Sequence, residues 1–510
     1  MSNRVIWIFF TACSLVWLAV SLALPPCMSG EDVYNFRDAG WNLASQGRFE
    51  SAALVQMHDL RPRLYAHYTP MMPLLFAGYA AVFPRTAYAG TIFNLLLGIA
   101  AAAVVLYVVL RQPPNRLRNT AAIAVAAVPA VFITYDRPEA LALVISATAI
   151  ALLARPFARP LLAGALIAIA FLAHPFAACA VALWTAALFL AANWKAPARW
   201  MVSARQVVVS AAVAFAVVVP VALGFYLADH ESLHRFAAHA LGIHSGLGVV
   251  VSQNHGGGFA AGMRKSILGA GPFEAWNFLM SLVSSLALAA WAIARRRGLS
   301  PHEWLPVVAA LGCAFTAVVL FPAQRNYTTF LAYLTPVGLL AVAARADRLA
   351  APALALLLFA VAINLPQAAF TLVKRYEQRP SYLASLQQPQ LLLAQLPDRE
   401  ATVAVEGDSY DLFKPEFDHM IRIKEVDDGD HFAKVAALAN CYDGYKGTAV
   451  LPLPAKLNAA DFRLIQPDPA HLWITLFGRK VMRAQWGFGC DLYVRNNLAA
   501  NATEGIRAGQ

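Results

Sequence analysis

Four clusters of polar and ionisable residues lie beside long apolar runs in the first two thirds of this 510-residue chain. They are Glu31-Asp32, Asp136-Arg137-Pro138-Glu139, His174-Pro175 and Gln324-Arg325-Asn326-Tyr327. A carboxylate can accept a proton from a hydroxyl group, and an arginine can bind phosphate through planar, bidentate donors. Because ionisable groups at membrane depth are costly, such clusters usually have a function. Their combined chemistry predicts a site with a general base and anion-binding groups.

The composition indicates that the elements around these clusters are membrane helices. Apolar residues make up 59% of the chain and charged residues 14%, whereas soluble domains have about 45–50% and about 25%. A soluble fold would expose much of this apolar excess as patches that do not stay solvated. The same figures exclude a disordered chain and a small disulfide-rich scaffold. The composition therefore predicts a polytopic α-helical membrane protein.

Charge divides the chain into two parts. Residues 371–510 contain 16 basic and 17 acidic residues, a density typical of a soluble domain. Residues 1–370 contain the other 24 basic and 12 acidic residues, so this part carries the net positive charge. Its basic residues stand between apolar runs instead of clustering on a soluble face, which argues against a nucleic-acid partner. We expect a membrane domain over residues 1–370 and a small α/β domain over residues 371–510.

Eleven apolar runs predict the helices of the membrane domain. They lie near residues 5–24, 86–110, 119–134, 139–154, 160–174, 175–193, 205–228, 274–294, 303–321, 327–344 and 349–370. The first run could also be a signal peptide. It exceeds the usual apolar region of about 7–15 residues, however, and we interpret it as a retained helix.

The basic residues between these runs predict their orientation. Loops that follow even-numbered runs are rich in arginine and lysine, and the positive-inside rule places such loops in the cytoplasm. We therefore expect a multi-pass protein of a bacterial inner (cytoplasmic) membrane, with a cytoplasmic N-terminus and a periplasmic C-terminal domain. The long loops 25–85 and 229–273 then share the outer face with the four clusters. Water and headgroups at span ends explain any one cluster, but less readily all four together.

The loop after the first run contains the most informative pattern. Glu31 and Asp32 precede apolar residues at spacings of three and four, which predict an amphipathic helix over residues 34–46 on the membrane surface. An acid at such a helix start is stabilising, and Asp32 is a suitable N-cap. Capping explains one acid more naturally than two adjacent ones. The segments that follow are Tyr65-Ala66-His67-Tyr68-Thr69-Pro70 and Pro73-Leu74-Leu75.

These residues resemble a pattern of the GT-C glycosyltransferases, integral-membrane enzymes that take a sugar from a polyprenyl-phosphate carrier. That pattern is an acidic pair after the first span, then Tyr, Ala-x-x-Leu and Gly, and later a His-Tyr-Pro-Pro-like segment leading into Pro-Leu-Leu. The chain is similar to the branch of protein O-mannosyltransferases and lipid A aminoarabinose transferases over residues 1–110, and in its helix layout beyond them. It has Glu-Asp at residues 31–32, where that branch more often has Asp-Glu, and Thr69 in place of the first proline. The order of the acids leaves open which of them is catalytic.

The resemblance implies a GT-C-like fold with a periplasmic site. Glu31 or Asp32 would deprotonate an acceptor hydroxyl, and cationic groups would stabilise the leaving lipid phosphate. The candidates for phosphate binding are Arg137, Arg325, Tyr327 and Lys265. The candidates for substrate binding are Tyr34, His67, Tyr68, Glu139 and His174. Three simpler roles stay open, because Arg137 could form a salt bridge with Asp136 or Glu139, His174 could end a helix, and Lys265 could contact anionic headgroups.

The outer loop 229–273 contains five histidines and the run Gly256-Gly257-Gly258. His230 and His234 stand one helical turn apart, but no cysteine accompanies them and no HExxH motif is present. We therefore assign no cofactor and keep a divalent metal only as a minor alternative. The glycine run favours a mobile gate over the site.

The C-terminal domain is expected to contain strands at residues 401–406, 449–453 and 472–477, with a helical run at 430–440 between the first two. Cys441 and Cys490 are its only cysteines. Because a disulfide is permitted outside the cytoplasm, we expect these two residues to form one.

The expected partners are a polyprenyl-phosphate sugar donor, a lipid, glycan or protein acceptor, and the lipid bilayer. Three other classes are weighed against this one: a ligase that transfers whole glycans from a polyprenyl diphosphate, a transporter or lipid flippase, and an assembly protein whose tail is the working part. Transporters usually show inverted repeats and broken helices at the midplane, and this sequence has neither. The acidic pair directly after the first run favours the single-sugar transferase.

Overall fold

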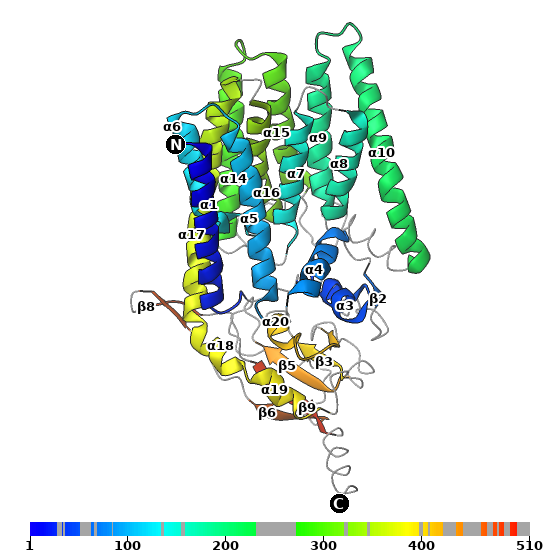
Figure 1. Cartoon of the computed structure of the whole chain (residues 1–510), viewed down its shortest axis with the longest axis vertical. Coiled ribbons are helices and arrows are strands. Elements are labelled where there is room, and N and C mark those ends of the chain that lie inside the picture. Colours follow the sequence, from blue (N-terminus) through cyan, green and yellow to red (C-terminus); the bar gives the residue numbers. More distant parts are fainter. Residues whose placement is uncertain are drawn as a thin grey trace, which may run out of the picture.

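The structure of the chain is a computed structural model in which helices predominate (Figure 1). It describes residues 1–27, 33, 36–51, 63–65, 69–83, 85–133, 137–154, 159–230, 272–320, 325–343, 347–396, 401–405, 409–421, 435–441, 461–466, 473–476, 479–483 and 490–496.

Long helices run side by side along the longest axis of the molecule (Figure 1). They are α1 (Asn3–Ala23), α5 (Ala89–Leu110), α6 (Arg116–Ala127), α7 (Glu139–Leu153), α8 (Pro160–Ala173), α9 (Pro175–Ala192), α10 (Arg199–Ala228), α14 (Pro272–Ala294), α15 (Pro301–Leu320), α16 (Arg325–Ala343) and α17 (Asp347–Glu377). Among the described residues, five of these helices are long and apolar enough to cross a membrane, namely α1, α5, α9, α10 and α17. The prediction of an α-helical membrane protein is supported to this extent, and the number of spans stays a prediction.

A helix lies in each of the predicted ranges, but one range is corrected. The run at 119–134 was expected to be a single helix, whereas α6 ends at Ala127 and a short 3-10 helix, η2 (Pro129–Phe132), follows. Proline lacks the backbone donor that would continue the helix and disfavours a helical conformation at the residue before it. Pro129 therefore ends α6 early.

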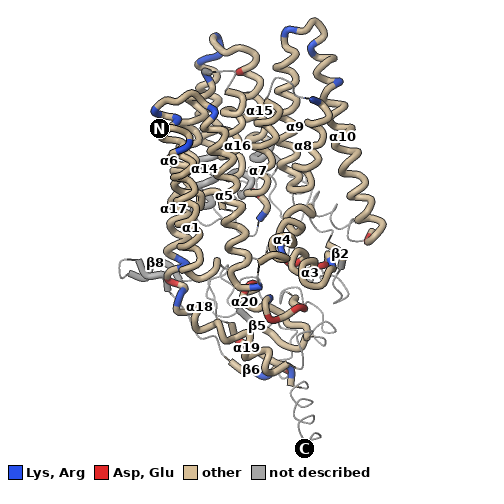
Figure 2. The backbone as a smooth tube through the Cα atoms, viewed as in Figure 1, with Lys and Arg blue, Asp and Glu red and all other residues tan. Residues whose placement is uncertain are grey.

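Basic residues are concentrated at one end of the bundle (Figure 2). The connections at this end include those between α5 and α6, α9 and α10, and α14 and α15, which contain Arg111, Lys195 and Arg295–Arg297. The opposite end of the bundle faces a β-sheet and the helices α3 and α4 (Figure 1). The chain thus brings the basic loops to one end and the first predicted outer loop to the other.

Small residues allow the bundle helices to pack closely. Gly338 of α16 lies against the indole ring of Trp184, where an added Cβ atom would come within 2.5 Å of the ring. Gly164 of α8 approaches α10 so closely that a Cβ atom would lie 2.5 Å from the carbonyl oxygen of Ser210. Such contacts are typical of helices that associate inside a bilayer, where close packing replaces the hydrophobic effect.

Two short helices, α3 (Asp38–Gln46) and α4 (Met71–Val82), cross each other beside the sheet-facing end of the bundle. A two-stranded pair, β1 (Glu50–Ser51) and β2 (Arg63–Leu64), joins them. The prediction of a helix over 34–46 is confirmed at residues 38–46, and residues 34 and 35 lie outside the described residues. The prediction that this helix lies on the surface is wrong for its first turn. The helix α3 begins at Asp38, and every residue from Asp38 to Asn42 is buried, so protein surrounds its first turn on all sides.

The C-terminal sheet has the strand order β4-β3-β5-β9-β6. Its strands are β3 (Val403–Val405), β4 (Met420–Ile421), β5 (Ala437–Cys441), β6 (Phe462–Gln466) and β9 (Cys490–Arg495). A separate hairpin consists of β7 (Trp473–Leu476) and β8 (Arg479–Arg483). Three short helices precede or accompany the sheet, namely α18 (Arg379–Ser385), α19 (Gln388–Leu393) and α20 (Tyr410–Phe413).

The expected strands at 401–406 and 472–477 contain β3 and β7, and the one at 449–453 lies outside the described residues. The helical run expected at 430–440 is wrong from Ala437 onward, where the chain forms β5. This strand lies parallel to β3 and antiparallel to β9. Because Ala437, Leu438 and Ala439 are all buried, the strand lacks the polar alternation that identifies a half-exposed strand.

The crossing of α3 and α4 gives a stability prediction. A Cβ atom on Gly40 would lie 2.5 Å from the backbone oxygen of Pro73, so Gly40→Ala must push the two helices apart. We expect it to lower the free energy of unfolding by about 1–3 kcal/mol, the usual cost of overpacking. Thermal unfolding of the purified protein measures the change.

The matched control is Gly78→Ala in α4, because nothing lies within 4 Å of a Cβ atom placed there. Alanine is the better helix former, so this variant should be as stable as the wild type or more stable by up to about 1 kcal/mol. If Gly40→Ala proves as stable as Gly78→Ala, the crossing is not tightly packed.

Candidate functional site

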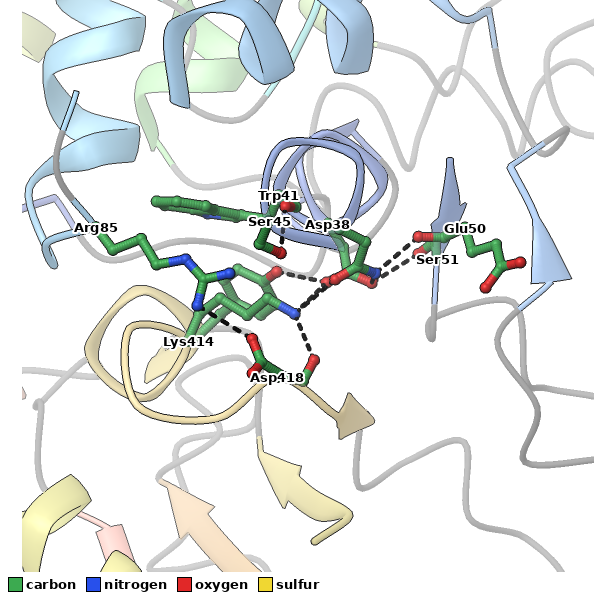
Figure 3. A network of polar contacts seen from close by, with 10 residues as sticks. Asp38, Trp41, Ser45, Glu50, Ser51, Arg85, Lys414 and Asp418 are labelled. Carbon is green, nitrogen blue, oxygen red and sulfur yellow. Dashed lines mark hydrogen bonds and ion pairs between the residues drawn. The ribbon is translucent and has the colours of Figure 1, made fainter. Parts of the chain in front are cut away.

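Asp38 is the centre of a buried polar network between the first loop and the C-terminal part (Figure 3). Its carboxylate accepts a hydrogen bond of 2.5 Å from the Tyr410 hydroxyl and lies 3.3 Å from Nζ of Lys414. Ser51 donates a hydrogen bond of 3.0 Å to the second oxygen. The carboxylate is fully buried, and these donors, together with the lysine charge, replace the water that an ionised group needs.

Arg37 precedes Asp38 and forms a bidentate ion pair with Asp411. Its two Nη atoms donate to the two carboxylate oxygens of Asp411 at 3.0 and 2.8 Å. The guanidinium is 1% exposed and lies over the ring of Phe76. It occupies space beside Gly90 of α5, where a Cβ atom would fall on the guanidinium. The bidentate geometry therefore fixes the orientation of this residue relative to α20.

Lys414 and Asp418 complete the network. Nζ of Lys414 donates to Oδ1 of Asn42 and to the backbone oxygen of Asp418, both at 2.9 Å. Arg85 pairs with the carboxylate of Asp418 at 3.1 Å, and both side chains are about a quarter to a third exposed. The network contains three ion pairs. The Arg37–Asp411 and Lys414–Asp38 pairs are buried, whereas the Arg85–Asp418 pair is partly exposed.

A second set of contacts holds the chain on the other side of the acidic pair. Arg375, near the end of α17, is buried and donates to the backbone oxygens of Pro25 at 2.7 Å and Ser21 at 2.6 Å. The Thr91 hydroxyl accepts a hydrogen bond of 2.7 Å from the backbone N–H of Cys27. The chain is thus fixed at Cys27, four residues before Glu31.

Thr69, which stands where the GT-C pattern has a proline, has a defined contact. Its hydroxyl donates to the backbone oxygen of Ala173 at 2.9 Å, and both residues are buried. His174 follows directly and is the N-cap of α9, where its Nδ1 accepts from the Phe176 N–H at 3.1 Å. Threonine at position 69 therefore joins the segment before α4 to the turn between α8 and α9.

Arg137 and Glu139 lie at the start of α7. Nε of Arg137 is 2.9 Å from a carboxylate oxygen of Glu139, so the local salt bridge weighed as an alternative is present. The Arg137 side chain is 21% exposed, whereas Glu139 is 2% exposed. The guanidinium is thus oriented by Glu139 and can still be reached from outside the protein.

One apolar cluster brings these segments together. It contains Val33 and Phe36 of the first loop, Leu141 in the first turn of α7, and Ala173 beside His174. The backbone oxygen of Val33 also accepts from the Arg37 N–H at 2.9 Å. Segments from three distant parts of the sequence, each containing a predicted site residue or directly adjoining one, therefore meet at the sheet-facing end of the bundle.

The remaining candidates are not placed. Glu31, Asp32, Tyr34, His67, Tyr68 and Lys265 lie outside the described residues. Arg325 and Tyr327 belong to the first turn of α16, and the structure describes only their backbone. No cluster of histidine, cysteine and acidic residues suited to a metal occurs among the described residues.

Cys490 forms a disulfide bond, and Cys441 is the residue directly opposite in the β5–β9 ladder. The other cysteines of the described part, Cys13, Cys27, Cys179 and Cys313, are free thiols. The register thus agrees with the proposed Cys441–Cys490 pairing.

A tyrosine pair also connects the bundle with the C-terminal part. The ring of Tyr382 in α18 lies edge-on to that of Tyr88, just before α5, with centroids 6.2 Å apart. Burial raises the pKa of the Tyr382 hydroxyl above its ordinary value, and the adjacent Tyr88 raises it further. Tyr382 therefore stays protonated and neutral at physiological pH.

Four residues of the network, Arg37, Asp38, Asp411 and Lys414, were not predicted from the sequence. A signal for them was present, because Tyr410, Asp411 and Lys414 share about one helical turn and could present complementary charges to the adjacent Arg37 and Asp38. Nothing local pairs the two segments, however, since more than 370 positions separate Asp38 from Tyr410.

No family model, no curated protein and no solved structure matches this chain.

The network predicts a large difference between two acid-to-amide substitutions. Asp38→Asn leaves the buried Lys414 without its carboxylate, so it should lower the free energy of unfolding by about 3–5 kcal/mol. Asp418→Asn affects a partly exposed pair and should cost less than about 1 kcal/mol. Thermal unfolding of the two purified variants checks the order, and similar losses would contradict the assignment of Asp38 as the central charge.

Proposed function

We propose that this protein is a GT-C-type glycosyltransferase that moves a sugar from a polyprenyl-phosphate donor to an acceptor hydroxyl at the periplasmic face of a bacterial inner membrane. The helices α1, α5–α10 and α14–α17 are its eleven membrane spans. Residues 371–510, which include the last two turns of α17, are its periplasmic domain.

The proposal rests on one observation above all. The chain around the acidic pair, the Arg137–Glu139 pair and the His174 turn converge at the same end of an apolar helical bundle, through the cluster that includes Val33, Leu141 and Ala173. Together with the acids that adjoin Val33 in the sequence, this arrangement supports a site for glycosyl transfer from a lipid phosphate, which needs a general base and cationic groups for the leaving phosphate. The motif resemblance of residues 31–75 supports the same class.

In the proposed mechanism, Glu31 or Asp32 takes the proton from the acceptor hydroxyl while its oxygen attacks the anomeric carbon. The bond from this carbon to the phosphate oxygen breaks, and the polyprenyl phosphate leaves with the bonding electrons. Arg137 stabilises the charge that develops on the phosphate, and its ion pair with Glu139 orients the guanidinium. Arg325, Tyr327 and Lys265 are further candidates for phosphate contacts, and Tyr34, His67, Tyr68 and His174 for substrate contacts.

Substitution of the two acids tests the base. We expect either Asp32→Asn or Glu31→Gln to reduce sugar transfer by about 10²–10⁴-fold, the usual contribution of a general base, and the other to weaken it less. The measurement is transfer of labelled sugar from polyprenyl-phosphate donors in membranes with equal amounts of each protein and a mixed pool of acceptors.

The control is Glu303→Gln, the same change at an acid that accepts from the Ser300 N–H and hydroxyl at the start of α15. Glutamine can make this cap as well, so activity should match the wild type. If both first-loop variants match the wild type, the acids only stabilise a helix start. If wild-type membranes transfer no sugar from any such donor, the proposed function is wrong.

The orientation is tested with reporters. Alkaline phosphatase is active only outside the cytoplasm, so we expect activity when it is fused after Gln510 and none when it is fused after Arg297, between α14 and α15. The basic residues at one end of the bundle (Figure 2) support this orientation, because basic loops stay in the cytoplasm. The reverse result would place the site on the cytoplasmic side and contradict the proposed topology.

A further inference from the structure

The chain segment that contains Glu31 and Asp32 is tied at both ends to residues of the C-terminal part. Before it, Arg375 binds the backbone of Ser21 and Pro25. After it, Arg37 binds Asp411, and Asp38 binds Tyr410 and Lys414. Only nine residues, 28–36, separate Cys27 from Arg37. Residues 375–414 therefore provide both anchors of a short segment.

The anchors Arg37 and Arg375 act through directional hydrogen bonds and not only through apolar packing. Arg37 reaches Asp411 through two parallel hydrogen bonds of 3.0 and 2.8 Å. Arg375 donates hydrogen bonds to the backbone oxygens of Pro25 at 2.7 Å and Ser21 at 2.6 Å. A planar guanidinium that makes two contacts restricts rotation as well as distance. Contacts of this kind define where a loop lies more narrowly than apolar contacts do.

Stability alone does not account for the inner pair. Replacing a buried ion pair by apolar residues of similar volume is often neutral or stabilising, because desolvation offsets the attraction. What the Arg37–Asp411 pair provides instead is a defined position of the first loop relative to α20. The charges of the network also satisfy one another, so it is not a site for an additional ion.

We infer that Arg37 and Asp411 are positioning residues for the acidic pair, and that the C-terminal domain takes part in catalysis by holding the first loop in register with the bundle. This inference rests on the proposed transferase activity. A displacement of about 1 Å of a catalytic group can cost up to about 100-fold in rate. Loss of the pair should therefore reduce kcat, while donor binding by the arginines of the bundle continues.

The decisive variant is the double substitution Arg37→Met with Asp411→Leu, compared with Asp411→Asn. The single variant removes the carboxylate charge that faces the buried Arg37 and should lower both Tm and kcat. The double variant removes both charges, so its Tm should return close to that of the wild type. Its kcat should stay at least about tenfold lower, with KM for the donor changed less than about twofold, because the directional contact is still missing.

Asp418→Asn is the matched control, since it removes an acid from the same interface through a partly exposed pair with Arg85. It should change neither kcat nor Tm appreciably. If the double variant regains kcat together with Tm, the pair is only structural and the inference is wrong.

Hydrogen–deuterium exchange provides a readout that does not need activity. Deuterium uptake over residues 28–36 should rise in the double variant relative to the wild type and stay unchanged in Asp418→Asn. Unchanged uptake in the double variant would overturn the inference. If wild-type membranes show no transfer, the proposed function fails separately, and the exchange result still decides whether the pair holds this segment.

Discussion

The burial of charge between the first loop and the C-terminal part is the constraint on which the rest of this structure depends. Arg37 and Asp38 are almost inaccessible to water, and their partners Asp411 and Lys414 belong to the C-terminal part, more than 370 positions further along the chain. A buried charge without a partner costs several kcal/mol, far more than an exposed one. The first loop and the C-terminal part therefore reach their final arrangement only together.

Two glycines show how the rest of the protein accommodates this requirement. Gly90 leaves space in the first turn of α5 for the guanidinium of Arg37, and Gly40 lets α3 approach the backbone of α4 at Pro73. Without these close approaches, the polar side chains of α3 could not reach α20 while its apolar side chains contact the bundle. Small residues at two crossings thus make a charged interface compatible with an apolar bundle end.

The sequence predicted those parts that depend on local pattern. Apolar runs of about twenty residues located the bundle helices, because each such helix satisfies its own backbone and needs no distant partner. The burial of the first turn of α3 and the strand β5 were missed, because tertiary contacts decide both. Asp38 is buried by Tyr410 and Lys414, and β5 is buried by β3 and β9. The Arg37–Asp411 pair joins positions 374 residues apart, and one sequence contains no pairing information at that distance.

The same reasoning explains why a site of the proposed kind would use a domain outside the bilayer. A general base works only within a narrow range of distance and angle from the hydroxyl group that it deprotonates. Helix ends in a bundle provide fixed positions for Arg137 and His174, and the proposed base needs an equally fixed position relative to them. A sheet with cross-strand pairing and a disulfide at Cys490 is a rigid support. Attaching Arg37 and Asp38 to helix α20 beside that sheet transfers its rigidity to the segment that contains the acids.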